Sequence, residues 1–465
     1  MQDVINLFVS AGNLMQTLSF FNVLSVFGIT SIEFPISVFM LFIGFAYATI
    51  KLNFVQIKML KEGLHQLLNP SNSKEGDKNV SPIKALFTAV AGSAGLNNTA
   101  GMASMVLIGG PGTAFWIPII IIGCMAFRFA EIYLSHHYRS EGYETSLGGP
   151  FDYMKKGFAD LGFKKIGSFA SIMYAVLMAL GGLFGISLFE LNQAVVIIKS
   201  GIPVLSDQTL LVSLACTLVV GYVIFGGSKR ISNFFGTVLP FLVGLFLTIS
   251  LIVIFYNYKQ IPYAFAAIIE DAFHPRAVAG GVIGSFVFCM KRMAMSSETG
   301  LGTAGIVHAT SAEKSSVKEA LGGMISPIIN GVFICFVSAF LVVITGVNKG
   351  DGILLLFNAF GSVHNLLTYG LVLLIPIMAM NVMIGWSNYG MKCVEYVAGH
   401  KFVKPYIMLY LIVGFSGGFV DDFQVVMRLV EGSIMILAII NVIAVMTLMP
   451  SVKKALTAHN IHKKK

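Results

Sequence analysis

The sequence predicts an all-α integral membrane protein with about eleven transmembrane helices. Of its 465 residues, 56% are hydrophobic and only 11% are charged, and the mean hydropathy is +0.82. These values lie far outside the range of soluble domains. Apolar runs of about 20 residues or more recur along the chain, and each can cross a hydrocarbon core about 30 Å thick. The runs lie near residues 33–54, 84–109, 114–135, 168–199, 209–227, 234–257, 280–300, 321–346, 365–386, 405–419 and 430–449.

The N-terminal part precedes the main set of spans. The first thirty residues contain no Lys or Arg, whereas a cleavable signal peptide starts with a basic segment. We therefore expect residues 1–32 to form an apolar extracytoplasmic lead-in of the kind that lies in the membrane interface. Residues 33–83 are expected to hold an extra helix, a cytoplasmic amphipathic helix in VQIKMLKEGLHQLL, and the polar linker NPSNSKEGDKNVS.

Basic residues are concentrated in alternate loops, and this asymmetry is the positive-inside signal. It predicts an extracellular N-terminus and a basic cytoplasmic tail at 450–465 in a multi-pass protein of the plasma (inner) membrane. The formal net charge of +9 follows from this placement, so we expect the lipid bilayer and not nucleic acid as a partner. The basic loops hold Lys58, Lys61, Lys74, Lys78, Arg139, Lys155, Lys156, Lys164, Lys165, Lys229, Arg230, Lys314, Lys318, Lys392, Lys401, Lys404, Lys453 and Lys454.

A short repeat divides the remaining spans into two groups of five, 84–257 and 280–449, joined by an extracytoplasmic loop at 258–279. GLNNTAG (95–101) lies in the first span of one group, and GLGTAG (300–305) ends the first span of the other. An odd number of helices per group gives the two groups opposite orientations, which predicts an inverted repeat. The alternative is that the two motifs are similar by chance, because the chain is rich in glycine. GLGTAG also fits a dinucleotide fingerprint, but it follows an apolar helix and not a strand, so we reject that interpretation.

The stretch AGSAGLNNTAG (91–101) carries glycine and asparagine at membrane depth. Glycine costs about 1 kcal/mol relative to alanine inside a helix, and asparagine favours caps and turns. The stretch therefore predicts an interrupted helix, which membranes tolerate only where the backbone is buried or lines a cavity. Its freed N–H groups attract a carboxylate, and its freed carbonyls coordinate a cation. A seam of small residues between packed helices is the alternative.

Two acidic residues lie in apolar runs. Glu190 lies in the outer half of a long run or at its outer interface, and burial in the core would cost about 2.5 to 3.5 kcal/mol, so it is expected to face a cavity or a partner. Glu298, in SSETG, is a functional candidate or half of a gate salt bridge with Arg292 or Arg128. His136 is expected at the surface, and the five cysteines show no ligand spacing, so neither a disulfide framework nor a metal site is predicted.

Five longer stretches carry a family resemblance. They are GGPGTAFWIPIIIIGCMAFRFAEIYLSHHYR (109–139), GGPFDYMKKG (148–157), GGSKRI (226–231), SSETGLGTAGIVHA (296–309) and IGWSNYGMKCVEYVAG (384–399). In this order they resemble the alanine or glycine:cation symporter family, sodium-coupled amino-acid carriers of the APC superfamily. The resemblance implies a LeuT-like fold, with one extra N-terminal helix before two inverted five-helix repeats. It also implies sites for a small amino acid and sodium around the broken first helix of each repeat.

The resemblance assigns roles to individual residues, with departures from the family pattern. The family's GTGNIAG aligns with GLNNTAG, so that Asn98 and Gly101 match while Leu96 replaces a threonine and Asn97 replaces a glycine. The expected substrate-binding residues are Gly95, Leu96, Asn97, Asn98, Glu190 and Asn192. The expected cation-binding residues are Gly92, Ser93, Asn381 and Val382. The expected gate or structural residues are Gly101, Arg292, Ser296, Glu298, Gly300 and Gly302.

The departures bear on the coupling ion. A threonine pair expected to face sodium aligns with Asn381 and Val382, and an Asp-Thr pair aligns with Asn330 and Gly331. These changes remove hard oxygen donors, which small cations need. Glu190, aligned with a glutamine, adds a carboxylate that can bind an amine or carry a proton.

The expected function is secondary active transport, a cation-coupled symport of a small neutral amino acid such as alanine or glycine by alternating access. Sodium or a proton is the expected coupling ion, with no cofactor and no metal beyond a transported sodium. A channel or a substrate sensor on a transporter fold is the alternative. No nucleophile and base pair is recognisable, so an enzyme is not predicted.

Overall fold

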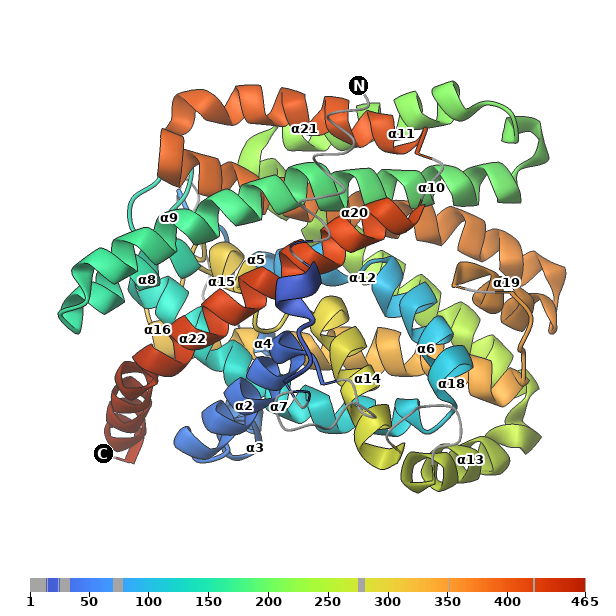
Figure 1. Ribbon diagram of the computed structural model, residues 1–465, viewed down its shortest axis with the longest axis horizontal. Coiled ribbons are helices and arrows are strands. Elements are labelled where there is room, and N and C mark those ends of the chain that lie inside the picture. The colour runs from blue at the N-terminus through green and yellow to red at the C-terminus, as the bar shows by residue number, and fades with distance from the viewer. Residues whose placement is uncertain are drawn as a thin grey trace.

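The computed structural model describes residues 14, 16–23, 25, 34–69, 78–274, 281–350, 352–420 and 423–464. Most of the expected N-terminal lead-in and most of the polar linker therefore lie outside the described residues. Long helices dominate the described part, and most of them run roughly along the long axis of the molecule (Figure 1). This agrees with the predicted all-α class.

The N-terminal half is built from these elements: α2 (Ile36–Lys51), α3 (Val55–Lys58), α4 (Leu60–Leu68), α5 (Pro82–Ser93), η2 (Asn97–Gly101), α6 (Met102–Gly109), α7 (Thr113–His137), α8 (Pro150–Asp160), α9 (Lys164–Gly181), η3 (Gly182–Ile186), α10 (Ser187–Gly201), η4 (Pro203–Leu205), α11 (Thr209–Ile224) and α12 (Gly227–Tyr256). The helix predicted between 55 and 68 is present as α3 and α4.

The C-terminal half is built from η5 (Tyr258–Gln260), α13 (Ile261–Phe273), α14 (Gly281–Ser297), α15 (Thr303–His308), α16 (Ser316–Gly323), α17 (Ser326–Ile328), η6 (Ile329–Phe336), α18 (Val337–Thr345), α19 (Ile353–Gly361), α20 (Asn365–Ala398), η7 (His400–Phe402), α21 (Val403–Gly417) and α22 (Phe423–Lys464). The segment expected to connect the two halves contains the amphipathic helix α13.

Six helices in the described part of the chain are long and apolar enough to cross a membrane, as judged by length and composition. They are Thr113–His137, Lys164–Gly201, Gly227–Tyr256, Ser316–Thr345, Asn365–Ala398 and Val430–Ile461. Two shorter apolar helices, Ile36–Lys51 and Thr209–Ile224, also occur. The count of about eleven spans and the inverted repeat remain predictions.

The first interrupted helix begins at Pro82 and breaks within the glycine-rich stretch. Proline suits the first helical position because its missing N–H has no partner there in any case. Helix α5 ends at Ser93, and Ala94 leaves the helical region with φ −82° and ψ 68°. The chain then resumes as the π-helical turn η2 and as α6, which ends where Gly110 takes φ +83°. The predicted break is therefore present.

The second interrupted helix breaks between α14 and α15. Glu298, Gly300 and Gly302 take positive φ angles of 52°, 96° and 86°. Glycine adopts this left-handed region at little cost, whereas a residue with a Cβ is strained there. The GLG sequence therefore permits the break, and Glu298 is held in it by contacts described below.

Candidate functional site

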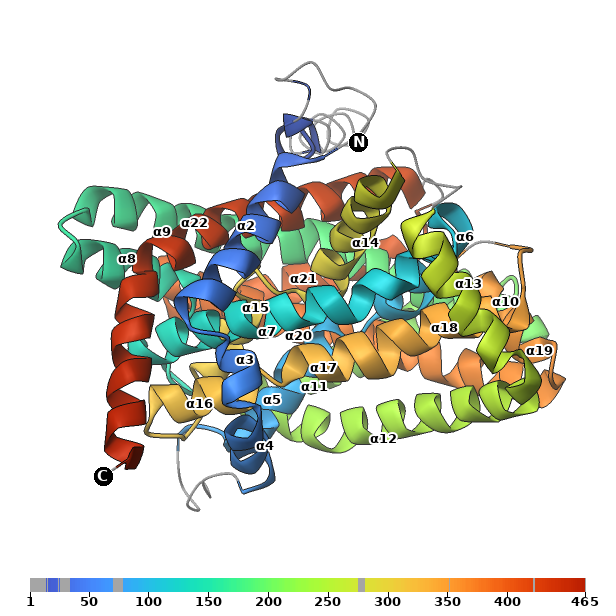
Figure 2. The same cartoon turned by 90° about the horizontal axis from the view of Figure 1, so that it is seen from below.

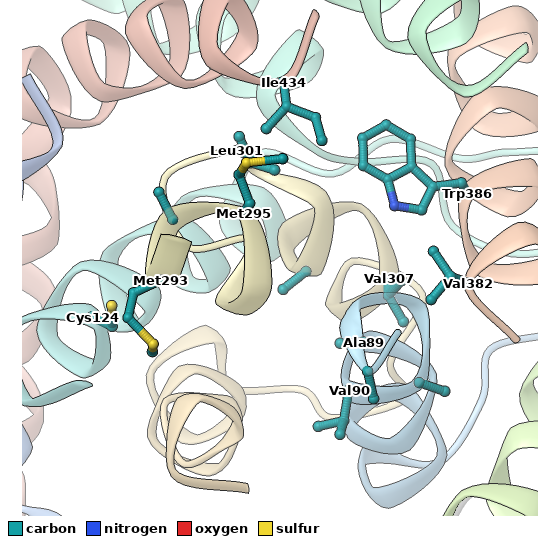
Figure 3. Packing of buried hydrophobic residues seen from close by; sticks show 14 of the residues in the cluster. Ala89, Val90, Cys124, Met293, Met295, Leu301, Val307, Val382, Trp386 and Ile434 are labelled. Carbon is teal, nitrogen blue, oxygen red and sulfur yellow. The ribbon is translucent and has the colours of Figure 1, made fainter. Parts of the chain in front are cut away.

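The two interrupted helices meet at their breaks. The side-chain Nδ2 of Asn98 donates to the carbonyl oxygen of Ser296 over 3.1 Å, and the Ser296 hydroxyl donates to the carbonyl oxygen of Asn97 over 3.2 Å. The other amide atom of Asn98, Oδ1, is buried and has no hydrogen-bond partner in the described part of the chain. The expected residues Asn97, Asn98 and Ser296 are thus brought together. Figure 3 shows the apolar side chains packed around this region, with Val382 and Trp386 of α20 beside α5 and the broken helix α14–α15.

Gly95 lies beside two other predicted residues. A Cβ built on Gly95 would lie 2.6 Å from Val382 Cγ2 and 3.2 Å from Glu190 Oε1. Glu190 is only 3% exposed, and its Oε2 atom has no hydrogen-bond partner among the described residues. A buried carboxylate without a partner is unfavourable unless a ligand, a cation or a proton satisfies it. The first break therefore faces a carboxylate that can receive one of these.

Asn381 is completely buried, at 0% exposure. Neither atom of its side-chain amide has a hydrogen-bond partner within the described residues. Together with Ala94 of the first break it lines a small cavity whose other walls are apolar: Leu239, Leu242, Val243, Phe246, Ile334 and Met378. One amide oxygen in an apolar cavity is a poor donor set for a small hard cation. Asn381 therefore lies at the first break, but its cavity is deficient in oxygen donors for sodium.

Ser93 and Gly92 lie just before the first break. Asn330 Nδ2 donates to the Ser93 hydroxyl oxygen over 2.5 Å, and this hydroxyl lies 3.1 Å from the carbonyl oxygens of Ala89 and Val90. Gly92 instead packs against α20, because a Cβ on Gly385 would lie 2.5 Å from its Cα. The stretch thus contains both the break at Ala94 and a seam of small residues at Gly92.

A buried cluster that we did not predict holds the second break. Glu131 of α7 is fully buried, and its Oε1 accepts from the backbone N–H groups of Gly300 and Gly302, each over 3.0 Å, and from Asn441 Nδ2 over 2.7 Å. The same Asn441 nitrogen donates to the Gly300 carbonyl oxygen over 2.8 Å. Glu131 therefore satisfies backbone N–H groups that the positive φ angles remove from helical bonding.

Arg128 completes this cluster one turn before Glu131. Its Nη2 donates to the Ser297 carbonyl oxygen over 2.5 Å and to the Thr299 hydroxyl over 2.9 Å. Its Nη1 lies 3.6 Å from Glu131 Oε2. The sequence signal for this cluster is FRFAE, an apolar stretch that carries two opposite charges three residues apart. Ionisable residues within a membrane span are energetically expensive and usually functional.

Glu298 is held by neutral donors. Its Oε1 accepts from Trp386 Nε1 and its Oε2 from the Thr303 hydroxyl, both over 2.7 Å. The gate salt bridge with Arg292 or Arg128 is therefore wrong for this conformation. Arg292 instead lies over the Phe288 ring, 5.8 Å from its centroid. Glu298 thus anchors the second break to α20.

Three further expected residues occupy structural positions. Asn192 donates to the carbonyl oxygens of Gly417 and Val420, each over 2.9 Å, and lies about 200° around the helix from Glu190. The structure therefore does not group these two side chains. Leu96 is 3% exposed within the core. A Cβ on Gly101 would lie 3.3 Å from Asn97 Oδ1, so this glycine gives room to the Asn97 side chain.

Two smaller expectations are tested here. His136 is buried at 3% exposure and its Nδ1 lies 2.9 Å from the Ser316 hydroxyl, so its expected surface position is wrong: α16 packs over the end of α7 and covers it. The five cysteines are free and buried.

Several known proteins are similar to this chain in sequence. The chain is 29% identical over 384 residues to the sodium/alanine symporter AgcS of Methanococcus maripaludis, covering 80% of this chain and 82% of that protein. It is 29% identical over 426 residues to the probable sodium/glutamine symporter GlnT of Bacillus subtilis, covering 90% and 86%. It is 32% identical over 314 residues to the putative sodium/proton-dependent alanine carrier protein YrbD of Bacillus subtilis, covering 67% and 62%.

The fold and the family follow from two further matches. The structure resembles the crystal structure of MhsT in complex with L-phenylalanine with a TM-score of 0.54 at 13% identity, over 77% of this chain and 87% of that chain, which shows a shared LeuT-like fold. Residues 18–465 match the profile of the sodium:alanine symporter family, whose members are transporters and not enzymes. The chain therefore belongs to the sodium:alanine symporter family.

Proposed function

We propose that this protein carries a small neutral amino acid across the membrane together with a cation, by alternating access around the two breaks. Alanine and glycine are the first candidates. The observation that carries the proposal is the junction of the breaks, where Gly95 faces the buried carboxylate of Glu190. Freed backbone N–H groups suit a substrate carboxylate, and Glu190 suits an amine, so the two ends of an amino acid would find opposite partners.

The crowding around Gly95 supports a small substrate. Val382 already lies within 2.6 Å of a Cβ built on Gly95, so little room remains for a bulky side chain. AgcS is named a sodium/alanine symporter and GlnT a probable sodium/glutamine symporter, and both amino acids are neutral. We infer a plasma-membrane location with the N-terminus outside, from the distribution of basic loops.

The coupling ion is proposed to be a proton or sodium, with the proton favoured by the site. The cavity at Asn381 presents a single amide among apolar side chains, where sodium would need several oxygen ligands. Glu190 offers a carboxylate that can take a proton in one state of the transport cycle. Coupling then means that cation binding and substrate binding strengthen each other.

The proposal is tested by uptake of radiolabelled alanine, glycine and a wider amino-acid panel into proteoliposomes. A sodium gradient and a proton gradient are imposed in turn, each with an ionophore control that collapses it. We expect accumulation above equilibrium under at least one gradient. Uptake that proceeds equally without any gradient would show a channel or a uniporter and would overturn symport.

A further inference from the structure

A polar pocket is lined by residues of α4, the start of α5 and α16, three helices that lie near one another in Figure 2. Its polar lining includes Gln66, His308, Glu313, Lys318 and Glu319. A pocket with this many polar groups admits water. Neither the family resemblance nor the breaks assign it a role.

His308 and Glu319 form a buried pair at the wall of this pocket. His308 Nδ1 lies 2.5 Å from Glu319 Oε1, and both side chains are only 1% exposed. The Ser311 hydroxyl donates to the other carboxylate oxygen, Oε2, over 2.7 Å. When Glu319 is ionised and His308 is neutral, the carboxylate accepts from the Nδ1–H group, and Nε2 then carries the free lone pair.

The Nε2 atom of His308 is buried and has no hydrogen-bond partner in the part of the chain that the structure describes. A buried nitrogen without a partner is costly unless it serves a ligand or water. His308 also lines the polar pocket, and its Nε2 lies beside Gly323, 3.0 Å from a Cβ built there.

We propose that His308, oriented by Glu319, is a proton-accepting site at this pocket, separate from Glu190, and that it loads and unloads protons during transport. Its role in transport rests on the proposed function, whereas the proton site itself does not. Protonation places a hydrogen on Nε2 and converts the pair into an imidazolium and a carboxylate, which attract each other. The proton comes from water in the pocket and returns to it.

Charged groups of both signs lie around His308. Carboxylates are supplied by Glu319 and Glu313, and a cation by Lys318. Arg139 donates to the carbonyl oxygen of Ser311 over 2.6 Å, and His136 of α7 is bound to the Ser316 hydroxyl. The pocket residues from α4 and α5 are uncharged.

The test uses the full chain in lipid nanodiscs with ¹⁵N-labelled histidine side chains. The signal lost in His308→Asn identifies His308, and His137→Asn serves as the exposed neighbouring control. We expect the His308 signal to titrate reversibly between pH 5 and 8. Glu319→Gln removes the attracting charge and should move this titration to lower pH. A signal that does not titrate between pH 5 and 9 overturns the proton site.

The second arm measures amino-acid uptake against pH in proteoliposomes. Asn at 308 can still donate to Glu319 but lacks Nε2, so a purely structural pair would leave the pH profile unchanged. We expect His308→Asn to flatten the profile and His137→Asn to preserve it. Titration with an unchanged profile overturns the role in transport. If the wild-type protein takes up no amino acid at all, the proposed function fails while the titration arm still decides the proton site.

Discussion

The side-chain amide of Asn98 donates a hydrogen bond to the carbonyl oxygen of Ser296, so the two interrupted helices are tied together at their breaks. The distance is 3.1 Å, and Asn98 is fully buried. The accepting carbonyl belongs to the last turn of α14, where carbonyl groups lack partners within the helix. The contact therefore couples the position of one break to that of the other.

Asn98→Ala removes this link and leaves a buried carbonyl without its donor. We expect a loss of about 1 to 3 kcal/mol in stability, seen as a lower thermal unfolding midpoint in detergent, together with reduced uptake. Asn97→Ala is the matched control, because Asn97 contributes its backbone carbonyl to the junction. Equal midpoints for Asn98→Ala and the wild-type protein would show that the link carries no stability.

Glu131→Ala removes the acceptor that satisfies Gly300 and Gly302 and leaves Arg128 buried without its counter-charge. Breaking one side of a buried ion pair costs about 3 to 5 kcal/mol. We expect the variant to be strongly destabilised and its transport rate to fall by more than about tenfold. Glu141→Ala, at an exposed loop position, should be neutral. Normal uptake by Glu131→Ala would show that the second break holds without the carboxylate.

Glu190→Gln keeps the shape of the side chain and removes its charge. If the carboxylate binds the substrate amine or carries a proton, substrate affinity should fall about tenfold or more and the pH dependence of KM should flatten. Uptake kinetics measured across pH 5.5 to 8.5 check both effects. An unchanged KM with an unchanged pH profile would remove Glu190 from the mechanism.

Gly95→Ala introduces a Cβ within 2.6 Å of Val382 and 3.2 Å of Glu190. We expect at least about a tenfold loss of transport efficiency, because an overpacked site must shift by tenths of an ångström or more. The second change Val382→Ala should restore part of the loss by removing the clashing methyl groups. Gly244→Ala, where a Cβ would meet nothing within 4 Å, is the control and should transport normally.

Asn381→Thr combined with Val382→Thr introduces the hydroxyl pair that the family resemblance implies at these positions. Replacing one amide oxygen by two hydroxyl oxygens near the first break should increase the stimulation of uptake by sodium. The ratio of uptake with and without sodium measures this effect, and Asn381→Ala is the paired control. No gain in the ratio would mean that sodium binds elsewhere or does not bind.

Residue types alone predicted the first interrupted helix, within 91–101, whereas the second was implied only by the family resemblance. Glycine and asparagine at membrane depth have a direct energetic meaning, so the break after Ser93 followed from residue type alone. The left-handed positions at Gly300 and Gly302 agree with the glycines of the second motif. Both features depend on the backbone preferences of individual residues, and these preferences can be inferred from the local sequence.

Contacts between distant segments were harder to predict. The Glu131 carboxylate reaches across to Gly300 and Asn441, which are separated from it by 169 and 310 positions. Nothing in the local sequence names these partners, although the buried charges of FRFAE indicate that partners must exist. The predicted salt bridge of Glu298 was wrong for the same reason. Its hydrogen-bond donors are the neutral side chains of Trp386 and Thr303, and sequence proximity does not reveal these contacts.

The close approach of Gly92 and Gly385 has a consequence for substrate size. Val382 lies three positions from Gly385, about one turn along α20, and Gly95 lies three positions beyond Gly92, just past the break at Ala94. The separation of the two backbones at the glycines therefore fixes the gap between the first break and α20. A side chain at either glycine would act as a wedge and widen that gap. In the proposed site, this gap would set the largest substrate that fits, so Gly92 and Gly385 would limit substrate size without contacting the substrate.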